Sequence, residues 1–542
     1  MTAHDTLRAA LVKAAASLGA PTTDVLLERP KDPTHGDIAT NLALALAKAL
    51  KAKPRDVATQ LVAALDLPAG IVKKTEIAGP GFINFFLAEA QLADVLDTIL
   101  KQGATYGRSN EGKQQQVNVE FVSANPTGPL HVGHGRQAAI GDAIATLLEW
   151  TDWNVTREFY YNDGGTQIAN LAKSVQARIK GTEIPEGGYH GEYIKEIADR
   201  YVVTHRNDTS GDDLDTIRRF AVAELRKEQD ADLLAFGVKF DVYFLESSLY
   251  DDGRVEKTVK RLAAAGHTFE AAGALWLRTT QFGDDKDRVM KKSAAKGGDY
   301  TYFVPDVAYH ADKWERGFHR AIDVQGADHH STVTRVRIGL QALDMGITPG
   351  YPEYVLHQMV TVMKGGEEMK ISKRAGSYLT VRELIDEVGR DAVRFFFLMR
   401  RADSHLVFDV DLAKQQTEEN PVFYVQMAHA RMSGIFRVAA REVASATPEG
   451  VDLSVLTEDE ERDLLKAIAE FPAAAAGAAA TLEPHRMTGF LESLARTAHA
   501  WYHKFRVLGE PQEAARLVLA RAVRQVLANG LSLIGISAPD RM

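Results

Sequence analysis

The chain has 542 residues, 45% hydrophobic and 25% charged, and contains no cysteine, which excludes disulfide bonds and thiolate zinc sites and fits a reducing cytoplasm. It holds no apolar run of membrane-spanning length, and its first helix-like stretch is charged rather than a signal peptide, so we expect no membrane partner. The formal net charge of −9 gives no overall attraction for nucleic acid, so any RNA contact must come from local basic patches.

Residues 1–108 are predicted to form a separate N-terminal domain with both helices and strands. The apolar spacing of Ile38–Leu50 predicts a helix, preceded by a turn and cap at Thr34–Asp37. Gly79–Leu87 reads as a strand. The polar, glycine-containing stretch Gly103–Gln116 is typical of a linker.

The stretch Val117–Gly135, VNVEFVSANPTGPLHVGHG, predicts a strand, then a turn, then the start of a helix. Alternating apolar residues mark the strand, and apolar residues at helical spacing follow from Ala138. The first turn of such a helix presents unpaired backbone N–H groups and a partial positive charge, which stabilise an anionic phosphate.

Four interpretations of this turn remain open from its residues alone. Gly133-x-Gly135-x-x-Ala138 fits a loose dinucleotide fingerprint, with Asp152 or Glu158 near the ribose position. His131 and His134 have the spacing of metal ligands, although no carboxylate lies in register. The HVGH run also resembles the HxGH turn of class I aminoacyl-tRNA synthetases, in which both histidines contact ATP phosphates. The fourth interpretation is a chance pair of histidines at a helix start.

A catalytic domain is predicted over residues 109–388. The strand Asn154–Phe159 and the helix Gly164–Lys180 continue the β-α-β rhythm, which favours a parallel, doubly wound sheet of Rossmann type with ligands at the carboxyl ends of its strands. A charged, largely helical insertion at about residues 181–322 is expected to interrupt the two halves of the sheet.

The second half is predicted to contain the strand Ala321–Val324, a turn over Gln325–His330 and the helix Ser331–Leu343. The turn contains Asp328, His329 and His330, which leaves a metal site as the lesser alternative. Without a third ligand in view, a strand-end turn near a nucleotide is the favoured interpretation.

A second short motif follows an apolar, strand-like run at Tyr354–Met363. Gly365-Gly366 is predicted to act as a hinge, and Lys370-Ile371-Ser372-Lys373 resembles the mobile KMSKS loop of the class I synthetases. Taken alone, this tetrapeptide is an ordinary solvated loop. Together with the upstream HVGH turn, it favours an enzyme that uses ATP.

Residues 389–542 are predicted to form an all-helical C-terminal domain. Asp391-Ala392-Val393-Arg394 is close to the DALR signature of anticodon-binding domains, and Asn420–Arg431 begins a long amphipathic helix. Further helices are expected at 473–480, Leu491–Val507 and Glu513–Leu533. Seven basic residues are candidates for an RNA-facing side, with scattered surface charge as the alternative: Arg431, Arg437, Arg441, Lys504, Arg506, Arg521 and Arg524.

With HVGH, KISKRAG, DAVR, NPVFYVQMAHAR and the N-terminal THGDIATNLALALAK in family order, the chain resembles bacterial arginyl-tRNA synthetases along essentially its whole length. The resemblance implies a class I catalytic domain with an N-terminal domain that contacts tRNA and a helical anticodon-binding bundle. It implies a monomeric cytoplasmic ligase that joins L-arginine to tRNA(Arg) through an arginyl-adenylate, with ATP as a substrate and Mg²⁺ as a cofactor.

The resemblance also implies roles for matching residues. His131 and His134 would stabilise phosphate charge, and Lys370 and Lys373 would hold the departing pyrophosphate together with Mg²⁺. Residues implied to bind ATP are Gly133, Gly135, Gly326, Asp328, His329, Met359, Val360 and Ser372. Residues implied to bind arginine are Glu120, Ser123, Asn125, Tyr302, Asp306 and Gln325. No metal site built by the protein is predicted.

The chemistry of arginine agrees with this set. A guanidinium has five donors in a planar fork and no acceptor, so its pocket needs carboxylate and amide oxygens in fixed positions. We expect Glu120 and Asp306 to supply them at strand ends. Such a site rejects analogues that lack the fork by roughly 10⁴–10⁵, so no editing domain is required. A nicotinamide dehydrogenase, a silent tRNA-binding paralogue and a synthetase for another amino acid remain as competing functions.

Overall fold

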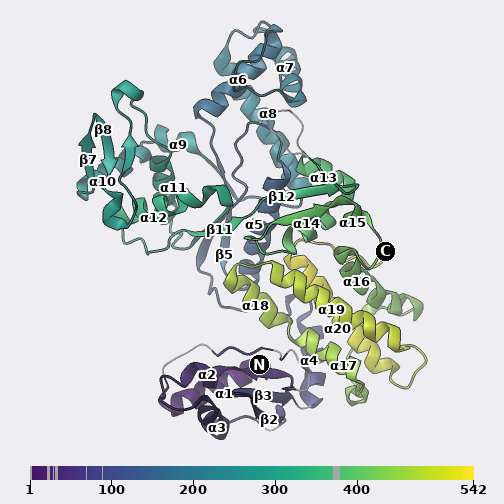
Figure 1. Ribbon diagram of the computed structural model, residues 1–542. Coiled ribbons are helices and arrows are strands. Elements are labelled where there is room, and N and C mark those ends of the chain that lie inside the picture. Colours follow the sequence, from purple (N-terminus) through teal and green to yellow (C-terminus); the bar gives the residue numbers. More distant parts are fainter. Residues whose placement is uncertain are drawn as a thin grey trace.

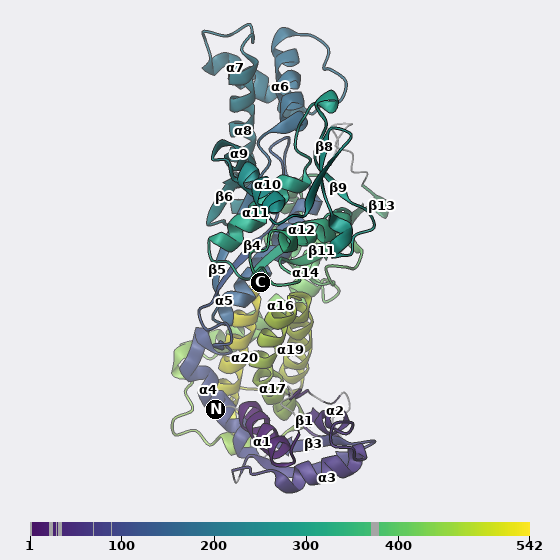
Figure 2. The same ribbon diagram turned by 90° about the vertical axis from the view of Figure 1, so that its left-hand side faces the viewer.

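The computed structural model describes residues 3–20, 25–28, 30, 35–68, 70–87, 89–369 and 379–542. The molecule is elongated (Figures 1 and 2). The N-terminal unit lies at one end, the helices α16 to α20 follow, the central sheet comes next, and helices α6 to α8 extend to the far end.

The central sheet has five parallel strands in the order β11-β10-β4-β5-β6. Their bounds are β4 (Gln116–Glu120), β5 (Asn154–Tyr161), β6 (Val242–Leu245), β10 (Ala321–Gly326) and β11 (Glu353–His357). This confirms the predicted doubly wound sheet. The strand order reverses between β4 and β10, and ligands bind at such a switch point, beyond the carboxyl ends of the strands.

Helix α5 (Val132–Trp150) is buried along most of its length against this sheet and the helical body. Its middle requires a glycine, because a Cβ at Gly141 would lie 2.2 Å from Cγ of Phe121. Helices α11 (Phe303–Glu315) and α12 (His330–Ala342) pack against each other near β10, and α6 (Gly165–Lys180) follows β5 in the chain. The predicted helices at Gly164–Lys180 and Ser331–Leu343 therefore form within one residue of their expected starts.

The predicted insertion at 181–322 is divided by the sheet, because β6 lies inside it and pairs with β5. On one side, α6 packs with α7 (Glu192–Thr204) and α8 (Leu214–Ala235) around a separate small core. On the other side lie α9 (Glu246–Asp251), α10 (Arg254–Ala264) and an antiparallel sheet of β7 (Thr268–Ala271), β8 (Ala274–Leu277) and β9 (Arg288–Lys291).

The N-terminal unit contains α1 (Ala3–Ser17), β1 (Ile38–Thr40), α2 (Leu42–Leu46), α3 (Pro54–Ala64), β2 (Val72–Ala78) and β3 (Phe82–Leu87). The prediction of one helix over Ile38–Leu50 is wrong at its start. Ile38–Thr40 instead pairs antiparallel with β3 and is fully buried there, and α2 begins only at Leu42. An apolar run this short fits either structure, and the partner strand decides. The core of this unit ends with β3, whereas α4 (Glu89–Gln102) packs against the C-terminal helices.

The strand-like run Tyr354–Met363 is divided between two sheets, β11 and a small sheet of β12 (Val360–Lys364), β13 (Glu367–Glu368) and β14 (Leu406–Asp409). Helices α13 (Val381–Val388), α14 (Arg390–Leu398) and α15 (Val410–Lys414) connect it to the helical body. That body contains α16 (Pro421–Val438), α17 (Asp459–Ala469), α18 (Phe471–Thr481), α19 (His485–Lys504) and α20 (Glu513–Leu533).

The helical body and the catalytic sheet share one continuous hydrophobic core. The buried Arg394 of α14 joins them, because its guanidinium donates to the backbone oxygens of Ile534 and Phe236 and to the Asp142 carboxylate on α5. Among the described residues, no helix is long and apolar enough to cross a membrane. Short 3-10 helices occur at Gly103–Thr105, Thr279–Phe282, Ala294–Lys296, Ala327–His329, Val443–Ser445 and Leu453–Val455.

Candidate active site

The HVGH turn forms the N-terminus of α5 and is closed by its own histidines. His131 is the N-cap, and its Nδ1 accepts from the backbone N–H groups of Gly133 at 3.1 Å and His134 at 3.4 Å. Nδ1 of His134 accepts in turn from the N–H of His131 at 3.3 Å, and the two rings stack with centroids 3.7 Å apart. In a neutral imidazole, an accepting Nδ1 leaves the proton on Nε2. Both rings therefore carry an Nε2–H donor, the group that suits a phosphate oxygen.

The two glycines of the turn are required by its packing. A Cβ at Gly133 would lie 2.9 Å from Cε1 of the His131 ring, and a Cβ at Gly135 would lie 2.8 Å from Cγ2 of Val381. Any larger residue would displace either the capping histidine or α13. The glycines predicted to bind ATP thus also hold the histidines in place.

Hydrogen bonds connect the start of α5 to the ends of β10 and β11, where the other residues predicted to bind ATP lie. Gln137 of α5 donates to the backbone oxygen of Val324, and Arg136 donates to those of Gln358 at 2.8 Å and Arg401 at 2.9 Å. Gly326 of β10 pairs with His357 of β11 in the sheet. The HVGH turn and the two strand ends therefore form one continuous edge.

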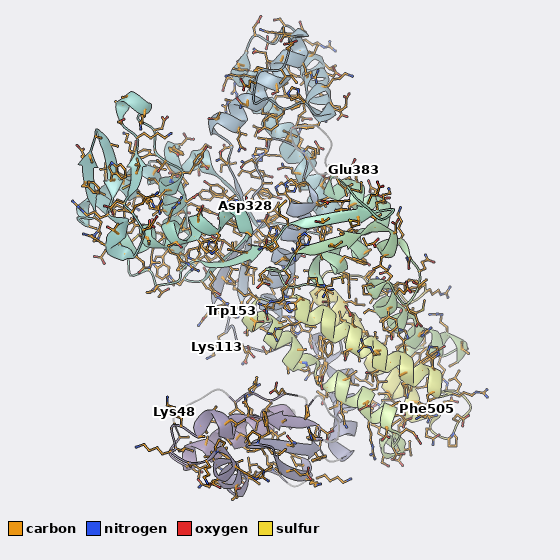
Figure 3. All side chains as sticks on the ribbon, in the orientation of Figure 1. Lys48, Lys113, Trp153, Asp328, Glu383 and Phe505 are labelled. Carbon is orange, nitrogen blue, oxygen red and sulfur yellow. The ribbon has the colours of Figure 1, made fainter. Side chains whose placement is uncertain are left out.

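Along this edge, the predicted nucleotide residues differ in exposure. Asp328 and His329 are exposed just beyond β10, Met359 is 77% exposed, and its neighbour Val360 is buried. Figure 3 places Asp328 in the central part of the molecule. The structure brings these residues to the same edge as the HVGH turn, as expected for parallel strands.

Lys370, Ser372 and Lys373 of the KISK motif lie outside the described residues. Gly365-Gly366, predicted as a hinge, forms the left-handed turn between β12 and β13, and Gly365 donates its N–H to Asp411. Beyond the motif, Thr380 pairs with His131 in an isolated bridge, and Val381 donates to the backbone oxygen of Leu130 at 2.8 Å. The first described residues after the motif therefore contact the HVGH turn.

The amino-acid side of the site begins with a kink after β4. Val122 and Ser123 both adopt left-handed backbone conformations, with φ of 69° and 39°. This is unfavourable for a β-branched residue and is typical of functional sites. The kink lets the Ser123 hydroxyl donate to Oε1 of Glu120 at 2.8 Å while it accepts from the N–H of Tyr160 at 3.2 Å. Sequence reasoning gave no signal for this conformation.

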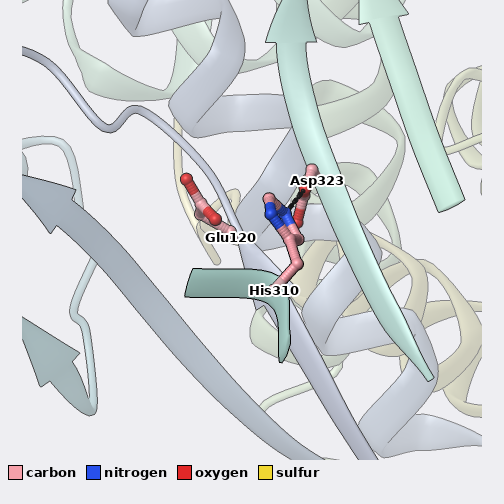
Figure 4. Close-up of side chains that lie close together, drawn as sticks. All are labelled: Glu120, His310 and Asp323. Carbon is pink, nitrogen blue, oxygen red and sulfur yellow. Dashed lines mark hydrogen bonds and ion pairs between the residues drawn. The ribbon is translucent and has the colours of Figure 1, made fainter. Parts of the chain in front are cut away.

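Glu120 is buried, and a lysine that the sequence analysis missed holds its other oxygen. Lys313 of α11 donates to Oε2 of Glu120 at 2.5 Å and to Asp323 at 3.0 Å. His310, one turn earlier on α11, lies 2.6 Å from the second oxygen of Asp323. Figure 4 shows Glu120, His310 and Asp323 meeting at the switch point between β4 and β10. Among the described residues they form the one group with metal-ligand proximity.

Two further carboxylates lie beyond Glu120. Asp306 stands in the first turn of α11, so its predicted place at a strand end is wrong, and Glu246 begins α9 directly after β6. Burial, together with the charges of Glu246 and Glu120, raises the pKa of Asp306 to about 7, although His310 acts in the opposite direction. Burial likewise raises the pKa of Glu246, whose carboxylate accepts from the Tyr160 hydroxyl at 2.8 Å. Among the described residues, neither carboxylate has an ion-pair partner, so the pocket favours a bound cation.

The remaining predicted arginine residues are less constrained. Tyr302 is 74% exposed at the start of α11, and Gln325 is half-buried near the end of β10. Asn125 lies in the loop before HVGH, where its side chain donates to Gln167 at 2.7 Å.

The structure adds four residues to the site: Lys313, Asp323, Glu246 and His357. Glu246 follows a strand end, which is the signal that identified Asp328, but the residues around it read as a helical insertion. His357 is buried at the end of β11, where burial lowers its pKa to about 4 and its Nε2 has no hydrogen-bond partner among the described residues. It is a neutral polar group at the nucleotide edge.

The dinucleotide interpretation finds no support in Glu158. This residue is fully buried, and its oxygens accept from Asn118, Tyr309 and both terminal nitrogens of Arg316. It has no oxygen left for a ribose. The metal interpretation of the HVGH pair is also disfavoured, because both histidines use Nδ1 to cap the helix.

Several basic residues proposed to face RNA make intramolecular contacts. Arg441 pairs with Glu513 at 2.9 Å, Arg524 with Asp540 at 2.7 Å, and Lys504 with Glu460 at 2.6 Å. These contacts favour the alternative of balanced surface charge for at least part of the set.

Comparisons with known proteins agree with this architecture. The arginyl tRNA synthetase N terminal domain matches residues 2–87, the catalytic domain of tRNA synthetases class I (R) matches 95–433, and the DALR anticodon binding domain matches 425–542. The chain is 57% identical to the arginine–tRNA ligase of Geobacter metallireducens, covering 96% of this chain and 95% of that protein.

Solved structures give the same picture. A putative arginyl-tRNA synthetase from Campylobacter jejuni aligns with a TM-score of 0.78 and 30% identity, covering 84% of this chain and 100% of that one. The arginyl-tRNA synthetase of Thermus thermophilus shares the fold, with a TM-score of 0.81 at 23% identity over 99% of this chain and 100% of that one.

Proposed function

This chain belongs to the arginyl-tRNA synthetase family, and we propose that the edge formed by β4, β10 and the start of α5 carries out both steps of its reaction. The protein is a class I aminoacyl-tRNA synthetase that charges tRNA with arginine. One observation supports placing the reaction at this site. The carboxylates of Asp306 and Glu246 have no ion-pair partner among the described residues, and they accompany a helix N-terminus capped by two histidines.

In the first step, an oxygen of the arginine α-carboxylate attacks the α-phosphorus of ATP, and the bond to pyrophosphate breaks. In the second, a ribose hydroxyl of the terminal adenosine of tRNA attacks the arginyl carbonyl, and AMP leaves. Phosphoryl transfer depends on positioning and charge stabilisation more than on covalent help. The Nε2–H groups of His131 and His134 and the N-terminus of α5 supply that stabilisation.

ATP lies along the strand ends in this proposal. Gly326, Asp328 and His329 follow β10, and the backbone of Met359 and Val360 lies where β11 gives way to β12. We assign contacts with the ATP phosphates to Lys370, Ser372 and Lys373, because Thr380, a little further along the chain, pairs with His131 in a backbone bridge. Their contribution is to hold the departing pyrophosphate.

Arginine occupies the acidic side of the edge. Its guanidinium is placed against Asp306 and Glu246, which need a cation and offer planar acceptors. Ser123, Asn125, Tyr302 and Gln325 complete the pocket. Glu120 was expected to hold the guanidinium, but Lys313 and Ser123 already contact its two oxygens, so it is assigned to the α-ammonium instead.

Mg²⁺ is proposed to arrive with ATP. The cluster of Glu120, His310 and Asp323 has metal-like spacing, but the Lys313 ammonium already contacts two of its carboxylates, so this cluster does not fit a metal. Mg²⁺ commonly binds through substrate phosphates and water with few protein ligands. A monomeric state and a cytoplasmic location are also proposed, and light scattering of the purified protein tests the first.

The decisive experiment is aminoacylation of total tRNA with ATP and each of the standard amino acids in turn. We expect charging with arginine alone. Charging with a different amino acid, or none with arginine, contradicts the proposed function.

Two variants test the roles of the phosphate-binding groups. His134→Asn and Lys373→Ala should each lower the rate of adenylate formation by roughly 10²–10³ while leaving arginine affinity nearly unchanged. Pyrophosphate exchange gives the rate, and equilibrium titration with arginine gives the affinity. An equal loss of both would remove the residue from phosphate binding.

A further inference from the structure

Four charged side chains form a buried cluster beside the proposed arginine site, and three of them have no part in the function proposed above. Glu120 comes from β4, Asp323 from β10, and His310 and Lys313 from α11. Lys313 and Asp323 have no exposed surface, and the other two are at most 5% exposed. A lysine this deeply buried is rare unless it is paired.

The cluster is closed and electrically balanced. Lys313 Nζ lies 2.5 Å from Glu120 Oε2, 3.0 Å from Asp323 Oδ1 and 4.5 Å from the centroid of the Tyr309 ring. His310 Nε2 lies 2.6 Å from Asp323 Oδ2, and its Nδ1 lies 2.7 Å from the backbone oxygen of Asp306. Both ring nitrogens face oxygen acceptors, so both donate and His310 is an imidazolium. Two cations therefore balance two carboxylates.

Lys313 contacts both carboxylates of the group that has metal-ligand proximity. The ligand atoms of Glu120, His310 and Asp323 lie within 4.8 Å of one another. The ammonium of Lys313 contacts a carboxylate from each of the two central strands, β4 and β10, whose Glu120 and Asp323 are direct partners in the sheet. It joins the strands at the switch point by charge-assisted hydrogen bonds.

This arrangement limits what Glu120 can do for a substrate. Its Oε2 is bound to Lys313, and its Oε1 accepts from Ser123, so its orientation is fixed and its charge is already neutralised. A forked guanidinium needs both oxygens of a free carboxylate, whereas a compact ammonium needs only one remaining lone pair. By contrast, Asp306 and Glu246 have no ion pair among the described residues.

We infer that Lys313 is a positioning residue that determines how arginine is oriented. By binding Glu120, it reserves that carboxylate for the α-ammonium and leaves Asp306 and Glu246 for the guanidinium. This inference rests on the proposed function and adds a residue to it. It also explains why a lysine is buried beside a binding site for a cation. Lys313 neutralises Glu120 but not Asp306 or Glu246, so the acids of the site differ in the charge that they offer to arginine.

The same helix provides a matched control. Arg316, less than one turn after Lys313, makes a bidentate pair with the buried Glu158 at 2.8 and 2.9 Å. The remaining contacts of Glu158 come from Asn118 and Tyr309, and none of these groups is proposed to bind a substrate. Lys313→Met and Arg316→Met both break a buried ion pair on α11, but only the first alters the pocket.

The test is pyrophosphate exchange in the presence of tRNA, with arginine and ATP titrated separately. Lys313→Met should raise the KM for arginine by about 10–100-fold, the effect typical of losing a residue that orients a ligand-binding group, with the KM for ATP little changed. Arg316→Met should lower the melting temperature comparably without altering either KM. Lys313→Arg keeps the charge and should restore most of the arginine affinity.

A double variant separates positioning from folding. Lys313→Met/Asp323→Asn removes one cation and one anion, so the buried charge is again balanced and the melting temperature should recover. Because Glu120 is still released, the KM for arginine should remain high. If the double variant recovers both the melting temperature and the wild-type KM for arginine, the inference is overturned. An unchanged KM for arginine in Lys313→Met also overturns it. If Lys313→Met does not fold, the double variant and Lys313→Arg decide by the same readouts. Failure of the wild-type protein to use arginine would instead contradict the proposed function.

Discussion

Two acids that lie beside opposite ends of helix α11 are satisfied in opposite ways. Glu158 lies beside the last turn of the helix and accepts from Arg316, Tyr309 and Asn118. Asp306, in the first turn, lies near other acids, and its pKa is raised to about 7 mainly by burial. A satisfied buried carboxylate stabilises the fold, whereas an unsatisfied one is retained at a cost in stability and marks a binding site.

The largest expected effect comes from Asp306→Asn. Losing one charge from a desolvated charge pair costs about 2–5 kcal/mol, so kcat/KM for arginine should fall by roughly 10²–10³. The melting temperature should stay the same or rise, because the variant removes an unpaired, partly buried charge. Steady-state kinetics and thermal unfolding measure the two effects. A loss of both activity and stability would place Asp306 with Glu158 as a structural acid.

Glu158→Gln should behave in the reverse way. It leaves the Arg316 guanidinium without its bidentate partner, and breaking a buried ion pair costs about 3–5 kcal/mol of unfolding free energy. The KM for arginine should remain near the wild-type value. Urea unfolding monitored by circular dichroism gives the stability. A strong rise in KM with intact stability would mean that the two acids do not differ in role.

The raised pKa of Asp306 gives arginine binding a pH dependence. Below a pKa of about 7 the free protein carries a proton on Asp306, which a bound guanidinium must displace. Affinity should therefore be constant above pH 7 and weaken by up to about tenfold, or 1.4 kcal/mol, per pH unit below it. Calorimetric titration between pH 6 and 8 tests this, with Asp306→Asn as the control. A slope that survives in the variant would assign the proton to another group.

Tyr160→Phe should give the smallest change. The Tyr160 hydroxyl donates to Glu246, and a hydrogen bond to a charged group contributes about 1.5–3 kcal/mol at most. Because only one donor is lost and Glu246 keeps its carboxylate, the KM for arginine should rise by roughly 3–10-fold, with the KM for ATP unchanged. An unchanged KM for arginine would show that Glu246 does not need this donor.

The nucleotide edge could be predicted from sequence because its residues are local. Strand β4, the HVGH turn and α5 follow one another within 35 residues, and each carries its own pattern of spacing and turn residues. The start of β10 was predicted for the same reason, although the strand continues to Gly326, two residues beyond its predicted end. Helix α20 forms over the predicted range Glu513–Leu533 because its apolar periodicity is long and uninterrupted.

The amino-acid pocket was predicted only in part, because its contacts depend on register between distant strands. Glu120 meets Asp323 across the sheet, and Lys313 reaches both from a helix nearly 200 positions away from Glu120. No local pattern marks Lys313, since a lysine on a helix usually lies in water. Glu246 was missed because β6 is short and lies among helical sequence.

The unpaired acids also determine which neutral molecules the pocket should refuse, and how. Citrulline has nearly the shape of arginine but carries a urea without charge, so it cannot compensate Asp306 and Glu246. To bind it, the pocket must first take up a proton from solution, and citrulline should therefore bind better as the medium becomes more acidic. Arginine should show the opposite trend, and the ratio of the two affinities would report directly on the charge of the empty pocket.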